Sequence, residues 1–359
     1  MTTSPTATRA TGAAVAARPV AGWPERGEST RDSTPWGLFG ILALGVAALM
    51  ALLVSLIVGG GAQAPLLADP GAVVRYGLPI AKLATTLGAS AAIGALLLAL
   101  LALARDTAAY DRALDVAAAG AALWALASAL TGFLVFLSVF LEPVALDDRF
   151  GRLLASFFTE QELGQAWLAT SLMAAVVTVL CFAVRSPALL AGVLVLAAAA
   201  LWPVAQTGHA GGTADHDAAV TAVFLHSVFA AVWVGGLLTL VLSRRVLGER
   251  LGTVLARYST LALVAFIVVS ASGLVSAQIR IGGLEGLDTP YGALLLAKVA
   301  SLVILGTFGA VYRRVLIARV QRATRPRASL WAIVVAELVV MGAASGIATA
   351  LARTAPPVE

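Results

Sequence analysis

The sequence predicts an all-α fold, a polytopic membrane helix bundle of about nine transmembrane helices. Composition is the first observation behind this: hydrophobic residues make up 60% of the 359 positions and charged residues only 12%, with a mean hydropathy of +0.94. A soluble domain usually carries about 25% charged residues. The second observation is a series of apolar runs of roughly 20 residues, the length that crosses about 30 Å of hydrocarbon as a helix. We therefore expect a multi-pass protein of the plasma or inner membrane, surrounded by the lipid bilayer.

The apolar runs divide the chain into three parts. Residues 1–35 are rich in Ala, Thr, Ser, Pro and Gly without an apolar period, which predicts a disordered cytoplasmic leader. Residues 36–352 form the expected transmembrane domain, and residues 353–359 the C-terminal tail. The nine expected spans lie near residues 37–59, 78–104, 114–141, 165–184, 187–206, 217–243, 256–278, 291–312 and 329–352.

The basic residues predict the orientation of these spans. With a cytoplasmic N-terminus, 17 arginines fall on the cytoplasmic side and five on the external side, and the two lysines among the 24 basic residues lie within spans. Positive charge concentrates on the cytoplasmic side of membrane proteins. The asymmetry therefore predicts a cytoplasmic N-terminus and an external C-terminus. It also accounts for the net charge of +5, so the charge does not indicate a nucleic-acid partner.

An external loop is expected over residues 142–164. Its segment 152–158, Arg-Leu-Leu-Ala-Ser-Phe-Phe, favours a short helix lying in the membrane interface. The acidic residues around that segment would raise the local concentration of cations. A solvated loop with an interfacial anchor is the alternative.

All three histidines of the chain, His209, His216 and His226, lie at the entrance and in the first turns of the sixth span. Imidazole is a ligand for copper, zinc, nickel and iron, and Asp215 and Asp217 supply negative charge beside His216. The loop before this span is expected outside the membrane, so a metal ion bound there comes from outside the cell. An exposed His216 beside a helix cap at Thr213 or Asp215 is the alternative.

His226 lies at membrane depth, where a polar side chain usually faces a cavity or a partner. A packing histidine with satisfied hydrogen bonds is the alternative to a functional role. His226 follows His216 by ten residues, about 15 Å along a helix, so the two are better suited to a relay than to a single site. Trp233 lies two turns further along the same face, and Gly235-Gly236 permits close approach of another helix. The next span carries a patch of small and polar residues near its outer end, which either lines a cavity shared with His226 or serves ordinary helix packing. The patch comprises Ser270, Ser272, Gly273, Ser276 and Gln278.

Two intramembrane charges, Lys298 and Glu337, approach the membrane midplane from opposite sides on the eighth and ninth spans. Ionisable residues within a membrane usually pair with one another or mark an ion pathway. We therefore expect them to meet as an ion pair, with either a structural role or an effect on proton or cation affinity.

Other functional motifs are missing from the sequence. Cys181 is the single cysteine, so there is no disulfide framework and no Cys-x-x-Cys motif for copper or haem. No Gly-x-x-x-x-Gly-Lys-Ser/Thr motif for nucleotide phosphates occurs. We therefore expect no enzyme, and any transport would be driven by a gradient, the membrane potential or handover.

Several motifs resemble the copper resistance protein D (CopD) family of membrane proteins. They are Thr207-Gly-His-Ala, Asp215-His216-Asp217, His226 with Ala230-Ala231-Val232-Trp233-Val-Gly-Gly236, Leu287-Asp-Thr-Pro-Tyr291-Gly-Ala-Leu-Leu-Leu-Ala-Lys298, and Arg75-Tyr-Gly-Leu-Pro79-Ile. The chain is similar to the N-terminal part of actinobacterial fusions in which a CtaG-type domain follows. This resemblance implies a copper ion as the metal, import or handling of copper, and a role in cytochrome oxidase assembly. An external copper chaperone or a CtaG-type assembly protein is the implied partner.

The sequence therefore predicts a membrane protein that binds copper at its external face and passes it inward or to a membrane partner. His209 and His216 would capture the ion, His226 would receive it, and Asp215 and Asp217 would hold charge nearby. Two alternatives remain open. One is a haem-binding membrane oxidoreductase with His209 and His226 as axial ligands, and the other is a non-transporting scaffold for assembly of the respiratory oxidase.

Overall fold

The computed structural model describes residues 1–2, 35–64, 69–105, 107–140, 147–207, 216–281, 283–320 and 327–357, without the side chains of His216 and of residues 312–330. The chain divides into two units, Met1–Thr34 and Pro35–Glu359. The helices belong to the second unit. Of the expected leader, residues 1–35, only residues 1, 2 and 35 are among the described residues.

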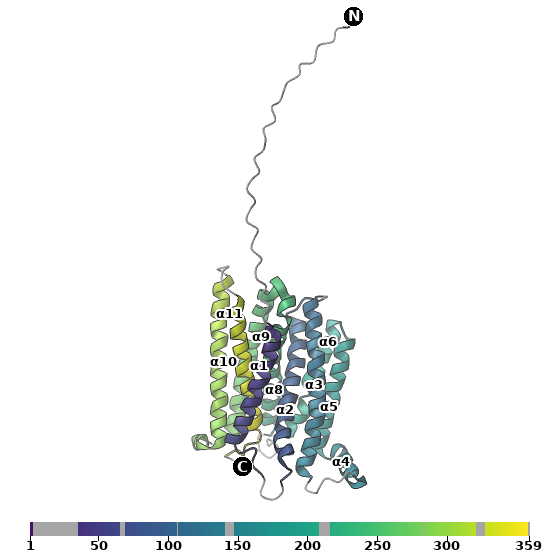
Figure 1. The fold of residues 1–359 in the computed structure, drawn as a ribbon, viewed down its shortest axis with the longest axis vertical. Helices are drawn as coiled ribbons and strands as arrows, with labels where there is room; N and C mark the ends of the chain where they lie inside the picture. The colour runs from purple at the N-terminus through teal and green to yellow at the C-terminus, as the bar shows by residue number, and fades with distance from the viewer. Residues whose placement is uncertain are drawn as a thin grey trace. The chain divides into compact units, whose positions relative to one another are not determined.

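Within the described residues of the second unit, the regular structure is helical and no strand occurs (Figure 1). A short 3₁₀ helix, Gly248–Arg250, joins two long helices, and another, Leu284–Asp288, precedes α10. The α-helices are α1 Trp36–Val58, α2 Ala72–Leu101, α3 Ala108–Val139, α4 Asp148–Glu160, α5 Glu162–Ala183, α6 Pro187–Ala199, α7 Trp202–Gln206, α8 His216–Leu247, α9 Leu251–Ile281, α10 Pro290–Val320 and α11 Arg327–Leu351.

These helices confirm the predicted membrane bundle. In the part of the chain that the structure describes, eight apolar helical stretches are long enough to cross a membrane. One of them, Asp217–Ile281, is 65 residues long and consists of α8 and α9, which turn at the 3₁₀ helix and pack against each other. Another combines α6 and α7. The nine expected spans therefore correspond in order to α1, α2, α3, α5, α6 with α7, α8, α9, α10 and α11.

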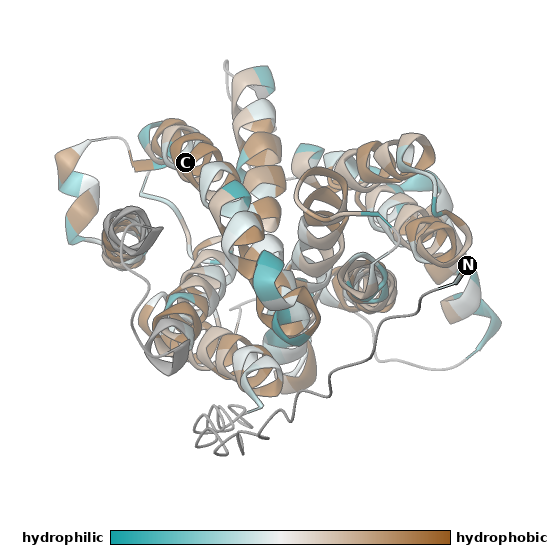
Figure 2. Ribbon diagram, turned by 90° about the horizontal axis from the view of Figure 1, so that it is seen from above, coloured by the Kyte–Doolittle hydropathy of each residue, from teal (hydrophilic) through white to brown (hydrophobic). Residues whose placement is uncertain are grey.

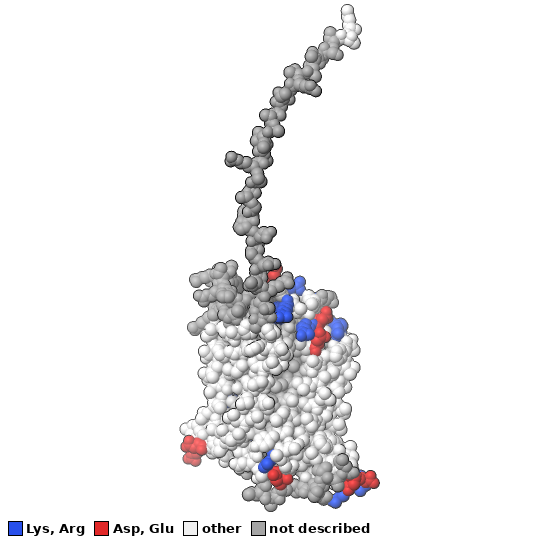
Figure 3. Space-filling view, in the orientation of Figure 1, with Lys and Arg blue, Asp and Glu red and all other residues white. Residues whose placement is uncertain are grey.

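The surface of the helices also suits a bilayer. Seen from above, most residues of the helices are apolar or neutral in colour and the hydrophilic ones are few (Figure 2). In the space-filling view, charged side chains gather at the two ends and leave a band without visible charge between them (Figure 3). An apolar band between charged ends is the surface that a multi-pass protein presents to lipid.

Glycines bring several of the helices into backbone contact. A Cβ at Gly342 or Gly346 would collide with the backbone of α1 at Leu44 or Ala48, and α1 and α11 lie side by side (Figure 1). The spacing Gly-x-x-x-Gly is typical of membrane helices that pack closely. A Cβ at Gly235 of α8 would likewise collide with the backbone oxygen of Ser90 on α2, which confirms the close approach expected at Gly235-Gly236.

α4 is the short helix expected near residues 152–158. Asp147 caps it by accepting a hydrogen bond from the Phe150 backbone nitrogen at 2.8 Å. Phe150 and Phe157 are buried against aromatic residues of α3, with Phe136 and Phe157 ring centroids 5.6 Å apart. The basic residues Arg149 and Arg152 are exposed, so the helix has the two faces that an interfacial segment requires.

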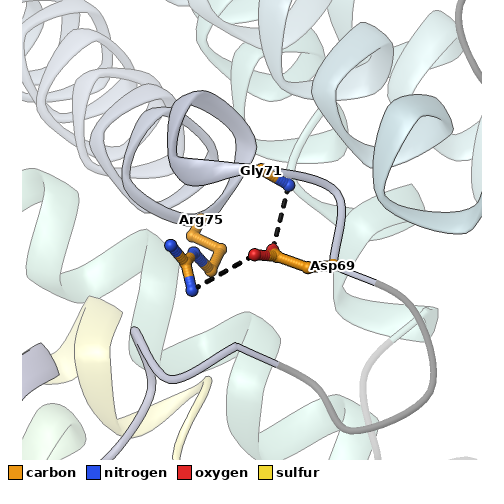
Figure 4. A network of polar contacts seen from close by, with 3 residues as sticks. All are labelled: Asp69, Gly71 and Arg75. Atoms are coloured by element: carbon orange, nitrogen blue, oxygen red, sulfur yellow. Dashed lines mark hydrogen bonds and ion pairs between the residues drawn. The ribbon is translucent and has the colours of Figure 1, made fainter.

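Two further contacts organise the same end of the bundle. Asp69 accepts a hydrogen bond from the Gly71 backbone nitrogen at 2.9 Å and pairs with Arg75 at 3.5 Å, which ties down the start of α2 (Figure 4). The described part of the expected C-terminal tail packs back onto the bundle, because Arg353 lies beside Gly61 and Pro357 beside Gly286. Partial burial lowers the pKa of Arg353 from its usual value.

Candidate metal centre

His226 lies in the third turn of α8, ten residues after its first residue, His216. At 1.5 Å per residue this position is about 15 Å along the helix, within the membrane span. The side chain is partly buried and faces α9, which packs against α8. His226 therefore faces the neighbouring helix α9.

Two groups of α9 hold the imidazole ring of His226. Its Nδ1 lies 3.2 Å from the backbone oxygen of Val269 and 3.2 Å from the hydroxyl oxygen of Ser272. A backbone carbonyl only accepts hydrogen bonds, so Nδ1 carries the proton and donates it. The neutral ring then keeps its lone pair on Nε2, the nitrogen that is free to bind a metal ion.

The small polar patch on α9 makes this arrangement possible. The Ser272 hydroxyl donates to the Val268 backbone oxygen at 2.6 Å, which leaves its lone pairs to accept from His226. Gly273 leaves room for the ring, since a Cβ there would lie 3.6 Å from the His226 Cε1. Ser276, one turn further, bonds to the backbone of its own helix. Ser272 and Gly273 therefore contact the candidate ligand, whereas the hydrogen bond of Ser276 only joins turns of α9.

The other members of the expected metal site are not brought together in the described structure. His209 and Asp215 lie outside the described residues, and the side chain of His216 is not described. Asp217 is exposed in the first turn of α8. Within the described ranges, no group of three or more His, Cys, Asp or Glu side chains is placed to hold a metal ion. The capture role of His209 and His216, and the axial pair His209 with His226, stay predictions.

A positive charge lies near His226. Lys298 on α10 is close enough to interact electrostatically with His226, and Arg280 at the end of α9 interacts with Lys298. Like charges near a site oppose the binding of a cation. A metal ion at His226 therefore needs negative charge from another source.

Trp233 lies on α8 about two turns after His226, and it faces Glu337 of α11. The indole ring of Trp233 packs edge-on against Phe266 with centroids 5.7 Å apart, and the Tyr258 hydroxyl donates to the Trp233 backbone oxygen at 2.8 Å. The Glu337 carboxyl lies beside the indole. Trp233 Nε1 nevertheless has no hydrogen bond of acceptable geometry within the described residues, although it is buried.

The expected ion pair between Lys298 and Glu337 is wrong. Among the described residues, the ion pair found is Arg75 with Asp69. Lys298 is eight residues from the start of α10 and Glu337 is 14 residues from the end of α11, so the two differ by about 9 Å in depth at 1.5 Å per residue. Lys298 lies near His226, whereas Glu337 lies near Trp233.

The sequence did not predict a cavity between α8, α9, α10 and α11. It has a volume of about 210 Å³, and its lining includes Trp233, Tyr258, Phe266, Gly309 and Glu337. Trp233 and Glu337 had both been noted, but nothing in their spacing of 104 positions shows that they meet. The glycines of α10 were the available signal, since small residues on one helix face leave space or permit close packing.

Two family models match the chain, one before and one after the segment that holds His226 and Trp233. Residues 72–215 match the family described as Copper resistance protein D-like, N-terminal domain, and residues 252–351 match Copper resistance protein D. Over 114 residues the chain is 33% identical to the Copper transport protein CutJ of Bacillus subtilis (strain 168), an alignment that covers 30% of this chain and 21% of the relative. The chain thus spans about a fifth of that relative's length. No solved structure matches the chain.

Proposed function

Because the chain belongs to the copper resistance protein D family, we propose that it takes copper from the external face of the membrane and carries it inward or hands it to a membrane partner. His226 is the observation that supports this proposal most directly. Its ring is fixed by α9 through Nδ1, and its Nε2 is the atom that binds the ion in passing. A fixed ring with one nitrogen held by an outer partner is the usual arrangement of a metal-binding histidine.

His226 acts as a transit position in this proposal. A pathway must bind its ion strongly enough to admit it and weakly enough to release it. One imidazole beside the positive charge of Lys298 meets the second requirement, because neither feature favours tight retention of a cation. The predicted external segment with His209, His216, Asp215 and Asp217 supplies the first, since it combines imidazole ligands with negative charge.

The proposal also names a source and an acceptor for the copper ion. An external copper chaperone delivers the ion, and a membrane acceptor of the oxidase assembly type takes it where copper is not carried across. The acidic residues around α4, which include Asp148, Glu160 and Glu162, attract the cation to the external surface. The protein acts as a carrier in this scheme and catalyses no reaction.

Copper affinity of the purified protein tests the central residue. In a protein that carries His209→Ala and His216→Ala, His226 is the one histidine left. Cu(I) competition against a coloured chelator should then show at least about tenfold weaker binding when His226→Ala is added, because loss of an inner ligand costs more than loss of an outer partner. Ser227→Ala is the matched control, since the Ser227 hydroxyl bonds to Val223 in its own helix at 2.8 Å. Unchanged affinity on addition of His226→Ala would remove the proposal's main support. A Soret band in the purified protein would instead favour the haem alternative.

Copper uptake separates import from handover. Proteoliposomes with the wild-type protein should accumulate copper if it is imported, and they should bind copper without accumulating it if it is handed over. Unchanged cellular copper together with lost oxidase activity in cells that lack the protein would point to the scaffold alternative.

Labelling tests the external location of the metal centre. A cysteine placed at Thr213 should react with a membrane-impermeant thiol reagent from outside, and one placed at Arg322 should not, because the basic loops are expected inside. The reverse pattern would overturn the orientation and with it an external site.

A further inference from the structure

The cavity between α8, α9, α10 and α11 has no part in the proposed copper pathway. Its volume of about 210 Å³ exceeds that of an engineered apolar cavity of about 150 Å³ that binds benzene. The lining is mostly apolar and aromatic, with Trp233, Tyr258 and Phe266 on one side and Leu305 on the other. Pockets of this kind, apolar with a few placed polar groups, are the usual sites for small molecules.

The cavity opens toward lipid. Leu263, one of its lining residues, is 39% exposed. The exposed side chains that surround this position on α9 and α10 are also apolar; they include Val264, Ile267, Val303 and Ile304. Glu337 is ten residues from the first residue of α11, about 15 Å along the helix, which places the polar wall deep in the bilayer. A ligand therefore enters from the hydrocarbon and must be soluble in it.

One polar group of the wall, the Trp233 indole nitrogen, makes no hydrogen bond of acceptable geometry within the described residues, although the Glu337 carboxyl lies beside it. Trp233 is only 6% exposed, and its Nε1 has no hydrogen bond within the described residues. An indole nitrogen only donates hydrogen bonds, and a buried donor without an acceptor is costly. A ligand oxygen that reaches the indole can accept the hydrogen bond that the Glu337 carboxyl, as placed, does not accept. Glu337 on the same wall can accept a hydrogen bond from a ligand hydroxyl.

Gly309 marks the space that the ligand would fill. It lines the cavity, and a Cβ built on it would meet no atom within 4 Å. Gly306, one turn earlier, already contacts the ring of Phe266 at 3.1 Å from a built Cβ. The open volume therefore lies beside Gly309 and next to the aromatic rings, where a planar molecule can stack.

We propose that this cavity binds a lipid-soluble aromatic carbonyl compound of the quinone class, with a ring carbonyl accepting a hydrogen bond from Trp233 Nε1. The ring packs between Phe266 and the small residues of α10, and the carbonyl satisfies the buried donor. A hydrocarbon chain of a lipid would fill the volume and leave the indole unpaired. Recognition of the carbonyl is what distinguishes the two occupants.

A matched pair of probes tests this site. The full-length protein in nanodiscs is titrated with 2,3-dimethyl-1,4-naphthoquinone and with 2,3-dimethylnaphthalene, which has the same ring system without the carbonyls. Bound ligand is measured by native mass spectrometry of the released protein. The wild type should bind the quinone several-fold more tightly than the hydrocarbon. Equal binding of the two probes, no binding, or displacement of both by co-released phospholipid would overturn the proposal.

Variants locate the binding. Trp233→Phe keeps a ring and removes the donor, so it should weaken quinone binding by about three- to tenfold and leave hydrocarbon binding unchanged. Trp124→Phe is the matched control, because Trp124 is also a buried indole without a hydrogen bond but lies outside the cavity. Gly309→Leu should abolish binding of both probes, with Gly45→Leu on the open face of α1 as its control. Unchanged quinone binding in Trp233→Phe would refute the site whatever Gly309→Leu does.

Discussion

Gly235→Ala gives the sharpest test of the packing that holds α8 in place. The added Cβ would fall on the backbone oxygen of Ser90 in α2, within a collision distance, and close to the Gly94 backbone. Backbone atoms cannot move aside as a flexible side chain can, so α8 and α2 must separate. Overpacking of a core costs about 1–3 kcal/mol and occasionally more. The rigid obstacle places this substitution at the upper end, at about 3 kcal/mol of destabilisation.

The sign of this effect is what makes the test decisive. In a helix interior, replacement of Gly by Ala alone stabilises by about 1 kcal/mol. Gly192→Ala on α6 should show that gain, because a Cβ there meets nothing within 4 Å. Free energies of unfolding from denaturant titration in mixed micelles would be compared for both variants. If Gly235→Ala were as stable as Gly192→Ala, the close approach of α8 and α2 would be refuted.

Three further predictions concern the residues around His226. Ser272→Ala should weaken copper binding by about tenfold, the lower end of outer-partner effects, because the Val269 oxygen still holds the ring. Ser276→Ala should match the wild type in the same competition assay. Equal losses of affinity in both variants would rule out positioning of His226 by Ser272. Lys298→Met should tighten copper binding, since the positive charge of Lys298 acts on His226 and a like charge near a site opposes a cation. Lys82→Met should not tighten it. Weaker binding in Lys298→Met would show that the lysine assists the metal. Lys298→Met and Glu337→Gln should be additive within about 0.5 kcal/mol in a double-mutant cycle of unfolding, and coupling above that would restore the ion pair.

The bundle itself was predictable because its signals are local. Each span is an apolar run of sufficient length, and a helix is the simplest way to satisfy its backbone in lipid. The interfacial helix α4 was likewise predictable from the mostly apolar run of residues 152–158 in a charged loop, although it extends over Asp148–Glu160. The start of α2 at Ala72 rather than near residue 78 was missed because the stretch before Leu78 contains Arg75, which pairs with Asp69.

The candidate site was predictable only in part, because contacts between helices are not written in the spacing along one helix. His226 and Trp233 were placed on one face by their seven-residue separation, and both face α9. The pairing of Lys298 with Glu337 failed for the same reason: depth along two helices was inferred from uncertain ends, and the rotation of each helix was unknown. Glu337 turns toward Trp233, a contact that depends on how α11 packs against α1 through Gly342 and Gly346.

Charge balance links the two parts of the proposed copper pathway. His226 is neutral when it binds metal. Lys298, which interacts with it electrostatically, is positive, and so is Arg280, which interacts with Lys298. The acidic side chains nearest to His226 along the chain are Asp217 and Asp215, nine and eleven residues earlier. Asp217 is exposed at the start of α8, about 13 Å from His226 along the helix. Occupancy of His226 by copper therefore depends on negative charge that arrives with the ion or comes from the segment before α8, so capture by the external segment and transfer to His226 must be coupled steps.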